Sequence, residues 1–66
     1  MIKSDVVKAM EMEREMLALE RLVKRQLDDG RYALANISTA KLNIIRDEYQ
    51  SLTGVRWQNA RRKLYK

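Results

Sequence analysis

Residues 4–30 read SDVVKAMEMEREMLALERLVKRQLDDG, a stretch that contains no proline and no glycine before its last position. Strong helix formers fill it, and its apolar side chains recur at intervals of three and four residues, which is the spacing of one helical face. We therefore predict one long amphipathic helix. Its apolar face consists of Ala9, Met12, Met16, Leu19, Val23 and Leu27, with Val6, Met10 and Leu17 widening one flank.

Residues that favour helix termini mark both ends of this segment. Ser4 or Asp5 can accept hydrogen bonds from the free amide groups of a first turn, and Asp28-Asp29-Gly30 is a typical stop signal. The first helix is therefore predicted over about residues 4–28.

The stretch from Gly30 to Ser38 mixes helix formers with β-branched and capping residues, which favours a turn and a short helical piece. With Ser38 or Thr39 as its cap, a second helix is predicted over about residues 38–52. Gly54 is placed to end it in the left-handed conformation that glycine adopts without strain. The apolar stripe of this helix is narrow and consists of Leu42, Ile45, Tyr49 and Leu52.

A third helix is predicted over about residues 55–66, with Trp57, Ala60 and Leu64 on the side that anchors it. The expected fold is all-α and forms a single domain over residues 1–66. The long first helix packs antiparallel on the second, and a short basic helix ends the chain. A homodimeric helical bundle is expected, because the apolar face of the first helix is wider than one narrow stripe can cover.

The composition excludes most enzymatic and metal-dependent functions. The 66 residues include no cysteine and no histidine, so disulfides, thiolate or imidazole ligands and catalysis by either residue are excluded. We predict a protein that is not an enzyme and needs no cofactor or metal. No apolar run approaches the roughly 18 residues of a membrane span, and the first residues do not follow the pattern of a signal peptide. A cytoplasmic protein without a membrane partner is therefore expected.

Positive charge is concentrated in the second half of the chain. Residues 1–30 hold six basic and seven acidic side chains, whereas residues 31–66 hold eight basic and two acidic ones. The segment from Val55 to Lys66 carries five positive charges and no negative charge. Such an asymmetry indicates a polyanionic partner.

The polar side of the predicted third helix holds residue types that suit a nucleic acid. Lys and Arg neutralise phosphates, Arg forms paired hydrogen bonds with guanine edges, and Asn does the same with adenine. We predict a small nucleic-acid-binding protein, with DNA favoured over RNA, that serves a phage, a plasmid or a bacterium as a regulator or accessory factor. The predicted binding residues are Arg56, Asn59, Arg61, Arg62, Lys63 and Lys66.

Two other interpretations fit the same segment. A basic helix end complements its own helix dipole and keeps a small protein soluble without binding a partner. It can also bind an acidic protein surface, as in an interaction module that modulates a host protein. These alternatives stay open at the level of the sequence.

The residues Trp57-Gln58-Asn59 followed by Arg61-Arg62-Lys63 resemble the end of a homeodomain recognition helix. That family has an extra aromatic residue between the tryptophan and the glutamine. One residue turns a helix by about 100°, so Asn59 points away from the direction that the family requires. We therefore do not assign the chain to it.

A helix that ends in Thr53-Gly54, followed by an arginine-rich tail that includes Tyr65, is similar to the small head-completion proteins of tailed phages. The resemblance covers about half of the chain and implies a small virion component. It also implies a β-hairpin between two helices, and the stretch from Gly30 to Ser38 is short for such a hairpin.

Overall fold

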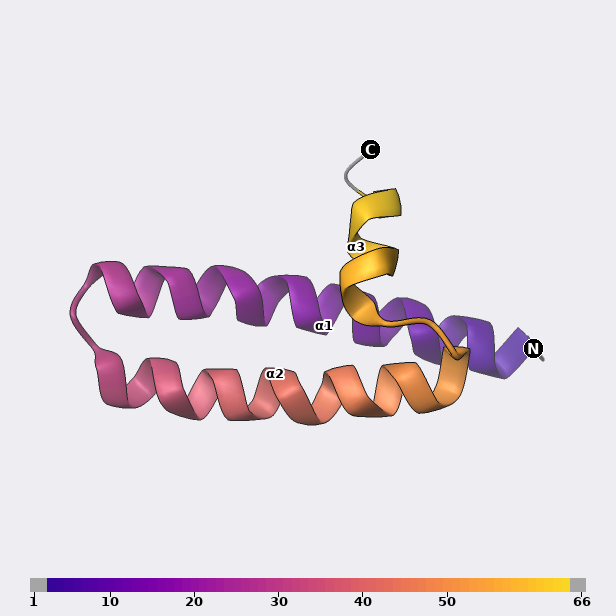
Figure 1. Cartoon of the computed structure of the whole chain (residues 1–66), viewed down its shortest axis with the longest axis horizontal. Coiled ribbons are helices and arrows are strands. Elements are labelled where there is room, and N and C mark those ends of the chain that lie inside the picture. The colour runs from indigo at the N-terminus through magenta and orange to yellow at the C-terminus, as the bar shows by residue number, and fades with distance from the viewer. Residues whose placement is uncertain (1–2, 65–66) are drawn as a thin grey trace.

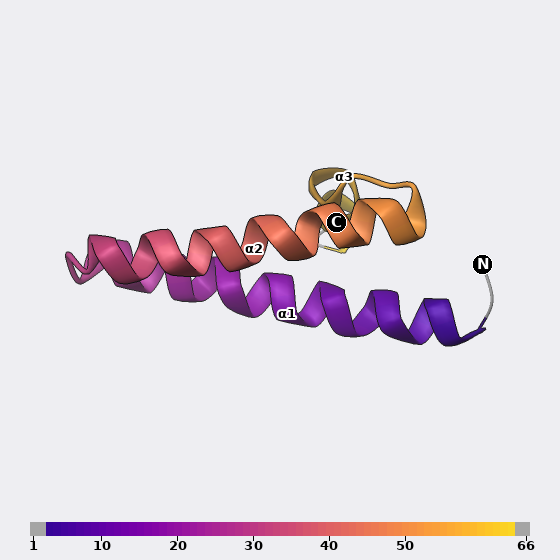
Figure 2. The ribbon, with the colours of Figure 1, turned by 90° about the horizontal axis from the view of Figure 1, so that it is seen from below.

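The computed structural model describes residues 3–64, which form the helices α1 (Lys3–Asp28), α2 (Tyr32–Thr53) and α3 (Trp57–Leu64). Helices α1 and α2 lie side by side and antiparallel, and α3 crosses them near the end of the pair where α2 finishes (Figure 1). Figure 2 shows that α3 lies on one side of this pair, next to α2. Within residues 3–64 there is no strand. The predicted all-α fold, with a long helix packed on a second one, is confirmed.

Helix α1 agrees closely with the predicted range, although its first turn differs. Ser4 and Asp5 lie inside the helix, so neither is its cap, and Asp5 instead places a negative charge near the positive end of the helix dipole. At the other end, Gly30 has a φ of 74°. The amide of Gly30 donates to the carbonyl of Leu27, and the amide of Arg31 donates to the carbonyl of Gln26, which together form a Schellman motif.

Helix α2 begins at Tyr32, six residues before its predicted start. The turn at Gly30 and the helical residues after it agree with the prediction, but the predicted cap at Ser38 or Thr39 is wrong, because the helix continues through both residues. Ser38 is buried in the helix, and its hydroxyl donates to Oε1 of Gln26 on α1 at 2.8 Å. Ala35 is buried beside it. Packing against α1 thus outweighs the weak local preference of this stretch for a turn.

The end of α2 follows the prediction. Gly54 adopts the left-handed conformation with φ 73° and ψ 6°, and its amide donates to the carbonyl of Gln50. The hydroxyl of Thr53 donates to the carbonyl of Tyr49 at 2.8 Å and accepts the amide of Val55 at 3.1 Å. These bonds set the direction in which the chain leaves α2 toward α3.

The hydrophobic core lies where the three helices meet and contains most of the residues predicted for it. Leu19, Val23, Ile45 and Leu52 are half-buried, as expected at the edges of an apolar face. Leu27 was predicted in the core but is exposed, because it lies at the hairpin end, beyond the reach of α3. The buried apolar residues of the core are Ala9, Met12, Met16, Leu42, Tyr49, Trp57 and Ala60.

One hydrogen bond in this core makes stability depend on pH. The hydroxyl of buried Tyr49 donates to Oε2 of Glu13 at 2.6 Å. Burial, and then this bond to a carboxylate, raise the pKa of Tyr49 from 10.0 to about 12. Because the folded-state pKa is the higher one, the stabilisation is present below pH 10 and is lost as the pH rises through about 12.

We therefore expect the free energy of unfolding to fall as the pH rises from 10 to about 12, and to fall less steeply in a Tyr49→Phe variant. Urea denaturation at several pH values in this range measures both slopes. Other titrating groups are common to the two proteins, so the difference between the slopes reports Tyr49. Equal slopes would contradict the assignment.

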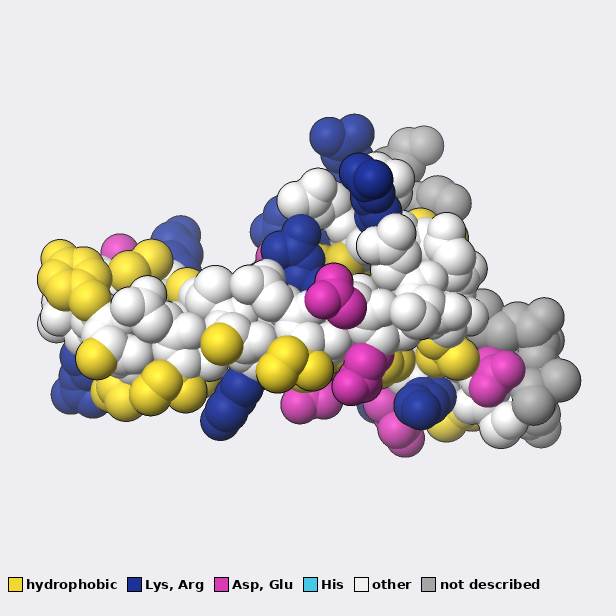
Figure 3. Space-filling model, turned by 60° about the horizontal axis from the view of Figure 1, so that its bottom comes forward, with side chains coloured by type: hydrophobic (Ala, Val, Ile, Leu, Met, Phe, Trp, Pro, Cys, Tyr) yellow, Lys and Arg dark blue, Asp and Glu magenta, His cyan; other side chains and the backbone are white. Residues whose placement is uncertain are grey.

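Many large apolar side chains remain on the surface. Figure 3 shows them at the hairpin end and along the lower part of the view, whereas Lys and Arg side chains gather on the projecting α3. Within residues 3–64, no helix combines the length and the apolar character required to cross a membrane. The exposed large apolar residues are Val6, Val7, Met10, Leu22, Leu27, Tyr32, Leu34, Ile37, Ile44 and Val55.

Candidate nucleic-acid interface

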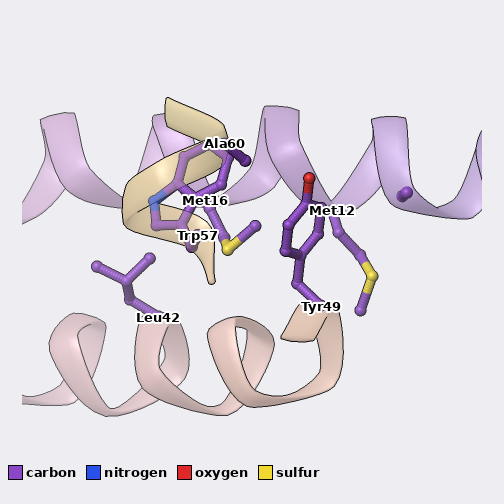
Figure 4. Close-up of a cluster of buried hydrophobic side chains, with 7 residues drawn as sticks. Met12, Met16, Leu42, Tyr49, Trp57 and Ala60 are labelled. Atoms are coloured by element: carbon purple, nitrogen blue, oxygen red, sulfur yellow. The ribbon is translucent and has the colours of Figure 1, made fainter. Parts of the chain in front are cut away.

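Helix α3 is held on the core by its apolar side. Figure 4 shows Trp57 and Ala60 lying over Met16, with Tyr49 close by. Trp57 is 3% exposed, and its ring meets the ring of Tyr49 edge to face with a centroid distance of 5.8 Å. This is the arrangement that aromatic quadrupoles favour. The predicted anchoring role of Trp57 and Ala60 is confirmed, and the side chain of Leu64 lies outside those that the structure describes.

An ion pair adds a second attachment between α3 and α1. Nε of Arg61 lies 3.1 Å from Oε1 of Glu20, and both side chains are partly exposed. This oxygen accepts no hydrogen bond from the described residues, so the contact is a charge pair. Arg61 was predicted to bind a partner, and it is directed instead toward the body of the protein.

The other predicted residues fall into two groups. Arg56, Asn59 and Arg62 are exposed. The carbonyl of Arg56 accepts the amides of Asn59 and Ala60, so Arg56 precedes the first turn of α3. Lys63 belongs to α3 but its side chain is not described, and Lys66 lies outside the described residues.

Two hollows flank α3 and bring an additional arginine to the surface. The first, of about 510 Å³, is lined by Arg46 of α2 and by Arg56 and Gln58. The second, of about 300 Å³, is lined by Arg46 together with Arg61 and Arg62. Arg46 therefore joins the positive charges of the C-terminal segment, although it lies ten residues before Arg56 in the chain. We call Arg46, Arg56, Arg61 and Arg62 the arginine surface.

No pattern in the sequence places Arg46 in this group. It follows Ile45 on α2 and is half-buried at the edge of the apolar stripe, a position that looks like an ordinary boundary residue. Only the direction in which α3 crosses α2 brings the two arginine-containing segments together. Asn43, whose Oδ1 lies 3.4 Å from Nη1 of Arg46, and Gln50 add polar groups to the first hollow.

Each hollow also contains one acidic side chain, so the charge around α3 is not uniform. Asp47 lines the first hollow, and Glu20 lines the second, where it pairs with Arg61. The four residues of the arginine surface outnumber these two acidic side chains, so the local charge is positive. Within residues 3–64, no group of acidic side chains is arranged to hold a metal ion.

Comparison of the chain with models of protein families, with curated proteins and with solved structures gives no match. The resemblance to head-completion proteins implies a β-hairpin between two helices. The corresponding part of the chain is the first two turns of α2 and the short connection before it, and no strand occurs within residues 3–64. The resemblance therefore contributes nothing to the interpretation of this fold.

Proposed function

We propose that the protein binds nucleic acid, DNA in preference to RNA, through the arginine surface and the exposed side of α3. The observation that supports this proposal is the clustering of exposed Arg56 and Arg62 with Arg46 around two adjoining hollows. Arginine guanidinium groups bind phosphate oxygens with paired, charge-assisted hydrogen bonds. A curved surface that carries several of them suits the closely spaced phosphates of a nucleic-acid strand.

The members of the surface have different roles in this proposal. Arg56 and Arg62 contact phosphates directly, and Arg46 contacts them from the adjacent helix. Asn59 is exposed, and its amide can pair with a base edge. Arg61 holds α3 against Glu20 and contributes positive charge to the surroundings. A role as a small regulator or accessory factor of a phage, plasmid or bacterium remains the sequence-based prediction.

A triple variant, Arg46→Ala, Arg56→Ala and Arg62→Ala, tests the proposal. If all three residues neutralise phosphates of duplex DNA, the slope of log K against log salt should become about 2.7 units less steep. Fluorescence anisotropy with labelled duplex DNA, single-stranded DNA and RNA, between about 50 and 200 mM salt, measures this slope and the order of preference.

A matched control removes three positive charges from elsewhere: Lys8→Ala, Arg14→Ala and Arg25→Ala, all exposed on α1. The control has the same net charge as the triple variant and should bind nearly as tightly as the unmodified protein. Equal losses in the two variants would mean that net charge alone is responsible. An absence of binding to all three nucleic acids at low salt would refute the proposal.

A further inference from the structure

The outer side of α2 carries an uncovered row of apolar side chains. Ala33, Ile37, Ala40 and Ile44 follow one another at spacings of four, three and four, and all are exposed. Ile37 is 55% exposed and Ile44 is 59% exposed. On the helical wheel this row lies opposite Leu42, which faces α1. We call these four residues the outer row; Figure 3 shows hydrophobic side chains along this side of the molecule.

The apolar face of α1, from which a dimer was predicted, is largely covered within the single chain. Its central residues Ala9, Met12 and Met16 are buried within the single chain, because α3 covers part of the face that α2 leaves open. The width of that face is therefore no argument for a partner. The outer row of α2 has no such cover within residues 3–64, and a spacing of four and three is that of a helix–helix seam.

We propose that the outer row is the contact between two copies of this chain, with the two α2 helices antiparallel about a two-fold axis. In one register Ile37 lies against Ala40 of the second copy, and Ile44 lies against Ala33. The two-fold axis repeats both contacts, so every isoleucine meets an alanine. Alternation of large and small residues across facing positions is what allows two helices to interlock. Sliding one α2 helix along the other by one helical turn in either direction leaves at least one isoleucine without an alanine opposite it.

The part of α2 that carries the outer row is poor in charge. The exposed acidic residues Asp47 and Glu48 follow the row toward the end of α2. Between residues 33 and 44 the only charged side chain is Lys41, which lies at the edge of the row near Leu34 of the second copy. Its aliphatic stem can cover that leucine while the ammonium group stays in water.

This arrangement also determines where the two α3 helices lie. Helix α3 packs on the flank of α2 that carries Asn43, Arg46 and Gln50. A two-fold axis perpendicular to both α2 helices keeps this flank on the same face of the dimer in each copy. The two Arg46 residues are then separated by roughly 22 Å along the helix axes, from a rise of about 1.5 Å per residue. If the proposed nucleic-acid function holds, the dimer offers two arginine surfaces to one duplex.

The oligomeric state tests the proposal independently of any nucleic acid. Sedimentation equilibrium of the full chain should give twice the monomer mass of 7.8 kDa. A double variant, Ile37→Glu and Ile44→Glu, should give the monomer mass with unchanged circular dichroism, because both positions are exposed. The control, Val7→Glu and Met10→Glu, places the same charges on exposed apolar residues of α1 and should stay dimeric. A monomeric unmodified protein at millimolar concentration, a dimeric double variant or a monomeric control would each overturn the proposal.

Cross-linking tests the direction of packing. The chain has no cysteine, so a single introduced cysteine is the only thiol that a cross-linker can react with. In the proposed register two copies of residue 40 are offset by about 4.5 Å along the helix axes, and two copies of residue 51 by about 38 Å. A short bismaleimide should therefore link Ala40→Cys into a covalent dimer and leave Ser51→Cys unlinked. Efficient linking of Ser51→Cys would indicate parallel helices, and no linking of Ala40→Cys would exclude contact at the outer row; either result overturns the proposal.

Discussion

Replacing Trp57 with alanine is expected to lower the free energy of unfolding by about 3–5 kcal/mol, the range for removal of a large buried aromatic side chain. Trp57 is the largest side chain of α3 in the core, and its ring packs against Tyr49. Its loss removes the main apolar anchor of a short helix and exposes Met16 beneath it. A domain of this size has a total free energy of unfolding of roughly 3–10 kcal/mol, so the expected loss is a large part of that total.

Urea denaturation followed by far-ultraviolet circular dichroism measures this loss. Tryptophan fluorescence is unsuitable because Trp57 is the only tryptophan of the chain. The neighbouring variant Gln58→Ala serves as the control, since Gln58 is exposed on the same helix and alanine is a better helix former. A Trp57→Ala variant as stable as the Gln58→Ala variant would show that α3 does not pack on the core as described.

A Met16→Ala substitution is expected to cost about 2–5 kcal/mol, because it leaves a cavity where all three helices meet. Among the side chains that the structure describes, only Met16 has 0% exposure, and the flexible methionine packs with Trp57 and Leu42. The loss combines the transfer of the apolar side chain with the contacts that neighbouring atoms no longer make. Filling the position with leucine should restore most of the stability, because leucine has a similar volume.

The chain supplies a close control for this experiment. Met10 lies on the same helix and is 49% exposed, so Met10→Ala removes the same atoms from a position near water. Its expected effect is within about 0.5 kcal/mol, as for other surface substitutions. Thermal and urea denaturation of both variants compare the two positions directly. Similar losses at Met10 and Met16 would contradict the burial of Met16.

The candidate site was predictable in part. The exposed positions of Arg56, Asn59 and Arg62 follow from placing Trp57 on the buried side of a helix, because residues on the opposite side of the wheel must then face outward. The same wheel put Arg61 near the boundary of the buried side, but it could not show that Glu20 lies within reach. That contact joins residues far apart in the chain, and its existence depends on where α3 crosses α1.

Features set by short-range physics were determined by the sequence alone. The length of α1, the left-handed stops at Gly30 and Gly54 and the burial of Tyr49 and Trp57 all follow from helical periodicity and from the conformational freedom of glycine. The helix length and the two stops involve neighbours within one or two helical turns. The periodicity marks Tyr49 and Trp57 as core residues, but their partners in the core come from other helices.

The tertiary structure decided the features that depend on contacts between residues far apart in the chain. The first turns of α2 are helical because Ala35 and Ser38 pack on α1, where Gln26 satisfies the buried hydroxyl that would otherwise favour a cap. Arg46 joins the arginine surface because α3 turns back over α2. Contacts of this kind arise from the crossing of helices, and their free energies exceed the few tenths of a kcal/mol by which local preferences differ.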